Sequence, residues 1–236
     1  MIRAGLALLV TAIALAVATA ATAADECRGL QVCLPAAGPW VVVPAGGAPV
    51  EYLLACPLRG YVVAGVDARL ADAEVDVAFR GETGSPVGPG VTTGQALLFS
   101  ARSTAAVPRP SSFRPFVGCI PTGGGGGRAQ TAYSAAPAGG IRPSRPLERV
   151  VVTRPLREGT TVVRLRCPRG GRLLGSAHAV SFRTRKPPSR PLLEAVSVSR
   201  AVSGGVVVAR AVAAAGSLEG TAPELQLHAL CRKAAP

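Results

Sequence analysis

Short apolar segments recur along this chain, and most are rich in β-branched residues and bounded by glycine or proline. Apolar and polar residues alternate in segments 73–77, 195–199 and 225–229, a pattern typical of strands with one buried and one solvent-exposed face. The predicted strands are 41–43, 50–55, 61–70, 73–79, 96–99, 150–153, 161–166, 173–182, 195–199, 206–212 and 225–231. Helical periodicity is nearly absent. Many short strands separated by turn residues predict an all-β, β-sandwich-like fold.

Two cysteine pairs with similar spacing indicate an internal repeat. Cys56 and Cys119 are 63 positions apart, and Cys167 and Cys231 are 64 apart. The sequence Pro-Leu-Arg-Gly-Tyr-Val-Val after Cys56 resembles Pro-Arg-Gly-Gly-Arg-Leu-Leu after Cys167, at an offset of 111. Val-Val-Val also occurs near the start of each half, with the register slipped by two. We therefore expect two tandem modules, module 1 at residues 25–120 and module 2 at residues 149–236.

The remaining segments have the composition of a leader and a linker. Residues 1–24 combine a basic start at Arg3, an apolar core and a small-residue end, the pattern of a secretory signal peptide. A signal anchor is the alternative reading of this segment. Residues 121–148 contain five consecutive glycines and several prolines, which resist ordering into strands and predict a linker between the modules.

Export gives the six cysteines a structural meaning, because an even number of cysteines in an oxidising compartment favours disulfides over metal ligands or catalytic thiols. Six cysteines allow 15 pairings. The repeat and the proximity of the cysteines favour Cys56–Cys119, Cys167–Cys231 and a local Cys27–Cys33. Each module has a thin core for its size, so a disulfide that closes a loop of about 64 residues contributes roughly 4 kcal/mol of stability.

Charge is distributed unevenly between the halves. Residues 25–120 hold seven arginines and eight acidic residues, whereas residues 121–236 hold 16 arginines and two lysines against five acidic residues. A basic surface attracts polyanions such as anionic lipid headgroups or envelope polymers. The candidate contact residues in module 2 are Arg164, Arg166, Arg183, Arg185, Lys186 and Arg190. Solubility and biased codon usage are the alternative explanation. Phe182 is the only aromatic residue of module 2, which weighs against nucleic-acid binding by base stacking.

Other chemistry-bearing residues form weaker patterns. His178 and His228 have no short metal-ligand spacing, and alternation places His228 on the exposed face of its strand. Asp72, Glu74 and Asp76 alternate with apolar residues, which on a strand places the three carboxylates on one face, as in a cation site, a carboxylate pair or a charged outer face. Residues 123–127 are glycines but lack the Lys-Ser/Thr of a phosphate-binding loop, and the chain has no G-x-S-x-G motif.

The segment from Gly38-Pro39-Trp40 through Cys56-Pro57-Leu58-Arg59-Gly60 to Cys119 resembles a module of uncharacterised secreted bacterial proteins. In these proteins a Cys-Pro-x-Gly strand start is followed by a glycine-containing strand and a closing cysteine. The second copy has the short form, Cys167 to Gly170, and the first has one extra residue before Gly60. The resemblance implies export and β structure, and it carries no assigned activity.

These observations predict a secreted protein, or one on the extracellular face of the cell envelope, that is not an enzyme and needs no cofactor or metal. Its expected role is binding or structural, with module 2 in contact with an anionic envelope polymer or lipid surface and no specific nucleic acid. A secreted hydrolase with an unrecognised site and a spacer without a ligand are the alternatives.

Overall fold

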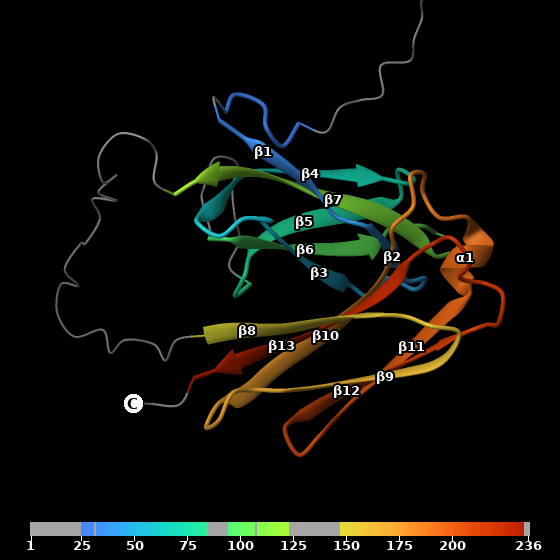
Figure 1. Cartoon of the computed structure of the whole chain (residues 1–236). Helices are drawn as coiled ribbons and strands as arrows, with labels where there is room; N and C mark the ends of the chain where they lie inside the picture. Colours follow the sequence, from blue (N-terminus) through green and yellow to red (C-terminus); the bar gives the residue numbers. More distant parts are fainter. Residues whose placement is uncertain (1–24, 31, 85–93, 107, 123–146, 234–236) are drawn as a thin grey trace, which may run out of the picture.

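The computed structural model describes residues 25–30, 32–84, 94–106, 108–122 and 147–233, and it confirms the all-β fold (Figure 1). Module 1 contains β1 (Leu34–Ala37), β2 (Trp40–Val43), β3 (Val50–Ala55), β4 (Tyr61–Leu70), β5 (Val75–Gly81), β6 (Ala96–Ser103) and β7 (Ser111–Pro121). Module 2 contains β8 (Leu147–Pro155), β9 (Gly159–Arg166), β10 (Arg172–Phe182), α1 (Arg190–Glu194), β11 (Val196–Ser203), β12 (Val206–Ala213) and β13 (Pro223–Arg232). None of the described segments is a helix long and apolar enough to cross a membrane.

Several predicted boundaries need correction. The predicted linker, residues 121–148, includes Pro121, Leu147 and Glu148, but these residues lie in β7 and β8. The predicted leader, residues 1–24, and linker residues 123–146 lie outside the described residues. The pattern missed β1 and β7 entirely. β5 begins at Val75, so Asp72 and Glu74 lie in the preceding turn and do not form a carboxylate ladder with Asp76.

The two modules repeat one strand pairing. In module 1, β7 pairs with β4 on one side and with β1 and β2 on the other, while β6 lies between β3 and β5 in a separate sheet. In module 2, β13 likewise pairs with β10 and β8, and β12 lies between β9 and β11. The continuous strand β8 thus occupies the place that β1 and β2 share in module 1. This common topology supports the tandem-repeat interpretation.

The register refines the alignment of the two copies. A bulge separates Val63 from Gly65 in β4, and an equivalent bulge separates Leu173 from Gly175 in β10. Val63 is opposite Cys119, and Leu173 is opposite Cys231, so the two strands correspond at an offset of 110. The predicted offset of 111 relates Cys56 to Cys167 and falls to 110 in the strands that follow, because the turn that ends at Gly60 has one residue more than the turn that ends at Gly170.

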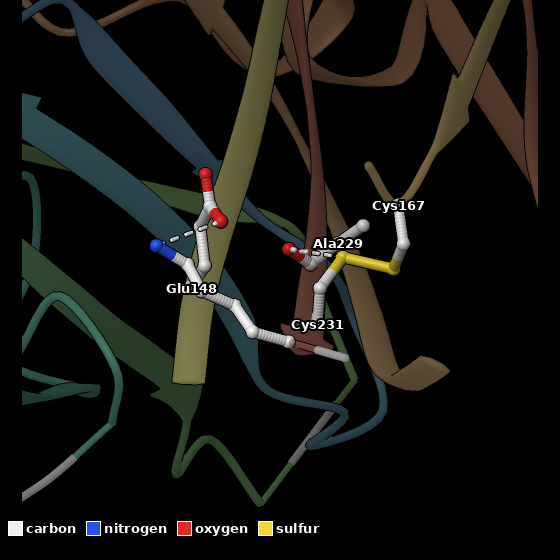
Figure 2. Close-up of a disulfide and its surroundings, with 5 residues drawn as sticks. Glu148, Cys167, Ala229 and Cys231 are labelled. Carbon is white, nitrogen blue, oxygen red and sulfur yellow. Dashed lines mark hydrogen bonds and ion pairs between the residues drawn. A yellow bond between two sulfur atoms is a disulfide. The ribbon is translucent and has the colours of Figure 1, made fainter. Parts of the chain in front are cut away.

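Three disulfides connect the described cysteines in the predicted pairs, Cys27–Cys33, Cys56–Cys119 and Cys167–Cys231. Figure 2 shows the last of these, between Cys167 at the end of β9 and Cys231 on β13. Cys56 after β3 and Cys119 on β7 form the equivalent bond in module 1. Each of the two bonds therefore joins the two sheets of its module. Three disulfides are typical of extracellular proteins.

Each module has its own hydrophobic core, and a strand pair joins the modules. Phe99 and Phe113 are buried in the core of module 1, and Phe182 and Leu227 in that of module 2. At the junction β2 pairs with β10, with Trp40 opposite Phe182. This pairing makes one seven-stranded sheet from both modules, while the two three-stranded sheets remain separate. Trp40 is 1% exposed, so the junction is closed to solvent around the only tryptophan of the chain.

Buried polar side chains add a second connection between the modules. The side-chain amide of Gln226 on β13 accepts a hydrogen bond from the Leu53 backbone N–H (2.7 Å) and donates to the Leu53 carbonyl (3.1 Å). Gln226 thus covers the free edge of β3 as a further strand would. Arg149 of β8 donates to the Glu82 carbonyl (2.6 Å) and pairs with the Glu51 carboxylate (3.0 Å). The module junction is therefore both a sheet continuation and a polar cluster.

Candidate functional site

The structure separates the six predicted cationic contact residues into two groups. Arg164 and Arg166 lie at the end of β9 beside the turn into β10, and Arg183 directly follows β10 together with Arg185, Lys186 and Arg190. All six side chains are exposed. β10 has 11 residues, so its length places the two groups roughly 35 Å apart. The predicted basic residues of module 2 therefore form two separate surfaces.

The first group lies on the outer face of the three-stranded sheet β11-β12-β9. Arg164 is opposite Val208 and Val162 is opposite Arg210, which places Arg210 diagonally beside Arg164 on the same face. Alternation along the predicted strand 206–212 could have placed Arg210 on the exposed face of that strand. Only the strand register shows that this face is shared with Arg164. Within the described residues, none of these three arginines forms an ion pair.

The second group contributes to a cleft between the modules, which we call the junction cleft. Its walls are formed by Ala37, Gly38, Pro39 and Arg114 of module 1 and by Arg183, Thr184 and Arg185 of module 2, around a volume of about 230 Å³. The β2–β10 pairing brings these segments together, because Pro39 precedes Trp40 and Arg183 follows Phe182. The sequence identified Arg183 and Arg185 but missed Arg114, which lies in the unpredicted strand β7.

Arg114 is held in place by an irregularity of the sheet. The Gly38 backbone N–H donates to the Pro115 carbonyl (2.8 Å), but Pro115 has no N–H with which to complete the pair. Nε of Arg114 donates instead to the Gly38 carbonyl (2.9 Å). The guanidinium also lies over the Phe116 ring, with 5.5 Å between Cζ and the ring centroid. Arg114 is thereby held in the wall of the junction cleft, and its two terminal nitrogens have no hydrogen-bond partner among the described residues.

The charges around the junction cleft are only partly compensated. Arg183 donates two hydrogen bonds to the Glu224 carboxylate (2.9 and 3.1 Å), which raise the pKa of Arg183 above its ordinary value. Arg190 pairs with Glu194 (2.8 Å). Arg114 and Arg185 form no ion pair with any described acidic residue. Three guanidinium groups against one carboxylate leave the cleft with a positive charge that suits an anion.

The chemistry of the cleft follows from the geometry of arginine. A guanidinium presents N–H donors in a planar fork that matches the oxygens of a phosphate or a carboxylate, and it remains charged at all physiological pH values. The Thr184 hydroxyl already donates its hydrogen bond to the Lys186 carbonyl (2.7 Å), so the arginines are the donors that would bind an anion here. Arg114 and Arg185 approach from different modules, so an anion between them would also bridge the modules.

The histidines and carboxylates singled out from the sequence are not brought together. The prediction that His228 is exposed is wrong, since the side chain is fully buried at the module junction. His178 lines a different, apolar pocket. In the part of the chain that the structure describes, no three His, Cys, Asp or Glu residues are placed to hold a metal ion.

The three acidic residues of segment 72–76 are engaged in local contacts. Asp72 accepts from the Glu74 backbone N–H (3.0 Å) and from the Ser111 hydroxyl, Glu74 pairs with Arg109, and Asp76 pairs with Arg102 (3.2 Å). Each carboxylate therefore has its own partner. This leaves the junction cleft as the candidate site that best combines residues from both modules. Comparisons with family models, with curated proteins and with solved structures found no match for this chain.

Proposed function

We propose that this protein is an exported, non-catalytic binding protein that holds anionic envelope polymers in the junction cleft. The observation that carries the proposal is the meeting of Arg114 from module 1 with Arg185 from module 2, without an acidic partner for either among the described residues. Phosphate or carboxylate groups repeated along a polymer fit this arrangement, because one group enters the cleft while its neighbours remain near Lys186.

Export and the envelope location rest on three supports of different kinds. The segment 1–24 has the composition of a signal peptide, and the described cysteines are all paired in disulfides. The third support is the sequence resemblance to modules of secreted bacterial proteins. Disulfides that join the sheets of each module keep a small core stable outside the cell. A protein held in this way can present a fixed cationic cleft to a polymer.

Binding of the mature chain to a phosphate-bearing wall polymer, to anionic liposomes and to DNA across a salt series tests the proposal. We expect binding to the wall polymer that weakens steeply as salt rises, because exposed charges are screened over about 8 Å at physiological ionic strength. The double variant R114Q/R185Q is expected to lose at least tenfold in affinity.

The matched control is R164Q/R166Q, which removes the same charge from the outer face of the β11-β12-β9 sheet. It should retain affinity within about threefold. Equal losses in the two variants would show that net charge alone attracts the polymer and would overturn the junction cleft as the site. Tighter binding to liposomes than to the polymer would assign the cleft to lipid headgroups and overturn the polymer as its ligand.

A further inference from the structure

A second, apolar hollow lies on a different side of the module junction and carries its own inference. It has a volume of about 360 Å³ and lies between β10, β11 and the segment that connects β2 to β3. Its walls include Val42 and Val50 from module 1 and Val180, Val196 and Val198 from module 2. We call it the valine pocket. Its volume is at the lower end of the range for ligand sites, about 300–1,000 Å³.

The pocket exists because one edge of β10 has no complete partner. Among the described strands, β2 pairs with this edge only at Ser181 and Phe182. In the other sheet of module 2, β11 is an edge strand. The module 2 sandwich is therefore open between β10 and β11. The side chains that line the opening belong to the inner faces, since Val180, Val196 and Val198 are also part of the module 2 core or pack against it. An apolar ligand there would extend the core.

Two polar side chains enter this otherwise apolar wall. Arg200 lies on the same face of β11 as Val196 and Val198, and it donates one hydrogen bond to the Ser176 carbonyl. Its other guanidinium N–H groups have no partner among the described residues. His178 lies on the same face of β10 as Val180, and its buried Nδ1 has no hydrogen-bond partner in the described part of the chain. Burial and the nearby Arg200 charge lower the pKa of His178, so the ring is neutral at pH 7.

We propose that the valine pocket binds a small apolar carboxylate, with the carboxylate on Arg200 and the apolar part among the valines. A permanent cation beside a valine-lined hollow recognises this combination, because the charge fixes the carboxylate while apolar burial supplies the affinity. A neutral His178 can donate its single N–H hydrogen bond to the same carboxylate when the proton is on Nδ1. The chemistry is shared by a medium-chain fatty acid and by the apolar C-terminal residue of a peptide.

The strand edge distinguishes these two sources. A second hollow of about 410 Å³ continues along β10 and shares Ala48, Pro49, Ala177 and Arg200 with the valine pocket. An extended peptide would lie along this groove and pair with the open edge of β10, whereas a fatty acid would occupy the valine pocket alone. This inference goes beyond the polymer-binding proposal and does not depend on the junction cleft, which uses Arg114 and Arg185.

Calorimetric titration of the full mature chain tests the proposal with three probes. These are sodium decanoate below its micellar concentration, the peptide acetyl-Gly-Val-Thr-Val with a free C-terminal carboxylate, and the same peptide as its C-terminal amide. We expect saturable one-to-one binding of decanoate or of the peptide acid, and at least tenfold weaker binding of the amide. Decanoate binding without peptide binding identifies a fatty-acid site. Binding of the peptide acid, together with slowed amide exchange along β10, identifies a peptide site.

Variants separate the pocket from a general charge effect. R200Q should weaken binding of the probe at least tenfold, whereas R210Q, which removes the same charge from the outer face of the neighbouring strand, should retain affinity within twofold. V198F should fill the pocket and abolish binding while thermal unfolding shows that the protein remains folded. Absence of saturable binding, or equal losses in R200Q and R210Q, would overturn the proposal. If the native chain failed to bind the wall polymer, the polymer proposal would be overturned but this one would stand, because the valine pocket and the junction cleft share no lining residue.

Discussion

At the scale of single residues, the polar cluster at the module junction shows how a buried histidine is held neutral. Nε2 of His228 donates to the side-chain oxygen of Gln226 (2.6 Å), which also accepts from Leu53. Nδ1 of His228 lies 3.5 Å from Nη1 of Arg149, which can only donate, so Nδ1 is the acceptor of this contact. This arrangement needs one proton on the ring, on Nε2. A second proton on Nδ1 would point at the Arg149 guanidinium.

This geometry predicts an acid-sensitive fold. Burial, with a smaller contribution from the Arg149 charge, lowers the pKa of His228 from its usual 6.5 to about 3. The unfolded chain therefore binds the proton more readily than the folded chain between these pH values, and stability is full above pH 6.5 and falls as pH decreases toward 3. The slope from one such group is about 1 kcal/mol per pH unit.

Urea denaturation at pH 7, 6 and 5 measures this dependence. The H228Q variant keeps a hydrogen-bonding side chain but cannot take up a proton, so its stability should fall less between pH 7 and pH 5 than that of the native chain. His178, whose pKa is also lowered, contributes a remaining slope in both proteins. Parallel stability profiles for the two proteins would show that His228 does not control the acid response.

At the scale of elements, the sequence was most informative where strands follow a regular pattern. The predicted strands 50–55 and 61–70 match β3 and β4 at both ends, and Pro49, Pro57 and Gly60 mark three of these four boundaries. β7 was missed because Pro115, Gly118 and Arg114 interrupt its apolar pattern. The strand exists because Pro115 faces the break between β1 and β2, where Arg114 supplies the missing donor. Such compensation depends on a partner 76 residues away.

The candidate sites were only partly predictable for the same reason. Arg183 and Arg185 are visible in a basic turn, since turns concentrate exposed charge. Arg114 and Arg200 each stand alone in the sequence, and they become part of a site only through strands that pair or pack across long separations. The exposed position predicted for His228 was wrong because alternation identifies two faces of a strand but not a second module that covers the outer one.

The segment 25–30 packs against two glycines, Gly65 and Gly118, which leave room for its backbone. A Cβ atom at Gly65 would lie 1.6 Å from the Glu26 carbonyl oxygen, and one at Gly118 would lie 2.1 Å from it. G65A should therefore displace the segment that the Cys27–Cys33 disulfide closes, with a loss of about 1–3 kcal/mol in the free energy of unfolding. Urea denaturation and hydrogen exchange of residues 25–33 measure the two effects.

Gly175 supplies a matched control for this variant. It follows the equivalent bulge in β10, and a Cβ atom there would meet no atom within 4 Å. G175A should change stability by no more than about 0.5 kcal/mol, as expected for a surface substitution without steric conflict. If both variants lose the same stability, the cost arises from the bulge itself and the proposed packing of residues 25–30 on the glycines is wrong.

At the scale of the whole molecule, the repeat produced two cores but one connected sheet. The pairing of β2 with β10 continues the sheet across the junction. The Arg149–Glu51 pair and the Gln226–Leu53 hydrogen bonds connect module 2 to β3 of module 1. Trp40 is at this junction and is the only tryptophan, so its fluorescence reports directly on the separation of the modules. Because the sheet is continuous, we expect the two modules to unfold together. Fluorescence and circular dichroism should therefore report the same urea midpoint in the native protein.

The Arg149–Glu51 pair predicts how this cooperation can be weakened. The Arg149 side chain is 5% exposed and that of Glu51 is 27% exposed, so R149M leaves a largely buried carboxylate without its cation. Loss of one partner from a fully buried pair costs about 3–5 kcal/mol, and the partial exposure of Glu51 reduces the expected loss to about 2 kcal/mol. The Trp40 transition should then precede the circular dichroism transition, because the junction opens before the cores.

The exposed pair Arg102–Asp76 is the control, since its side chains are 62% and 55% exposed. R102M should lose less than about 1 kcal/mol and keep the two transitions coincident, because water already screens this pair. If R149M also keeps them coincident and loses no more than R102M, the polar cluster does not couple the modules. The β2–β10 pairing would then be sufficient to hold them together, and the arginine would serve only to neutralise Glu51.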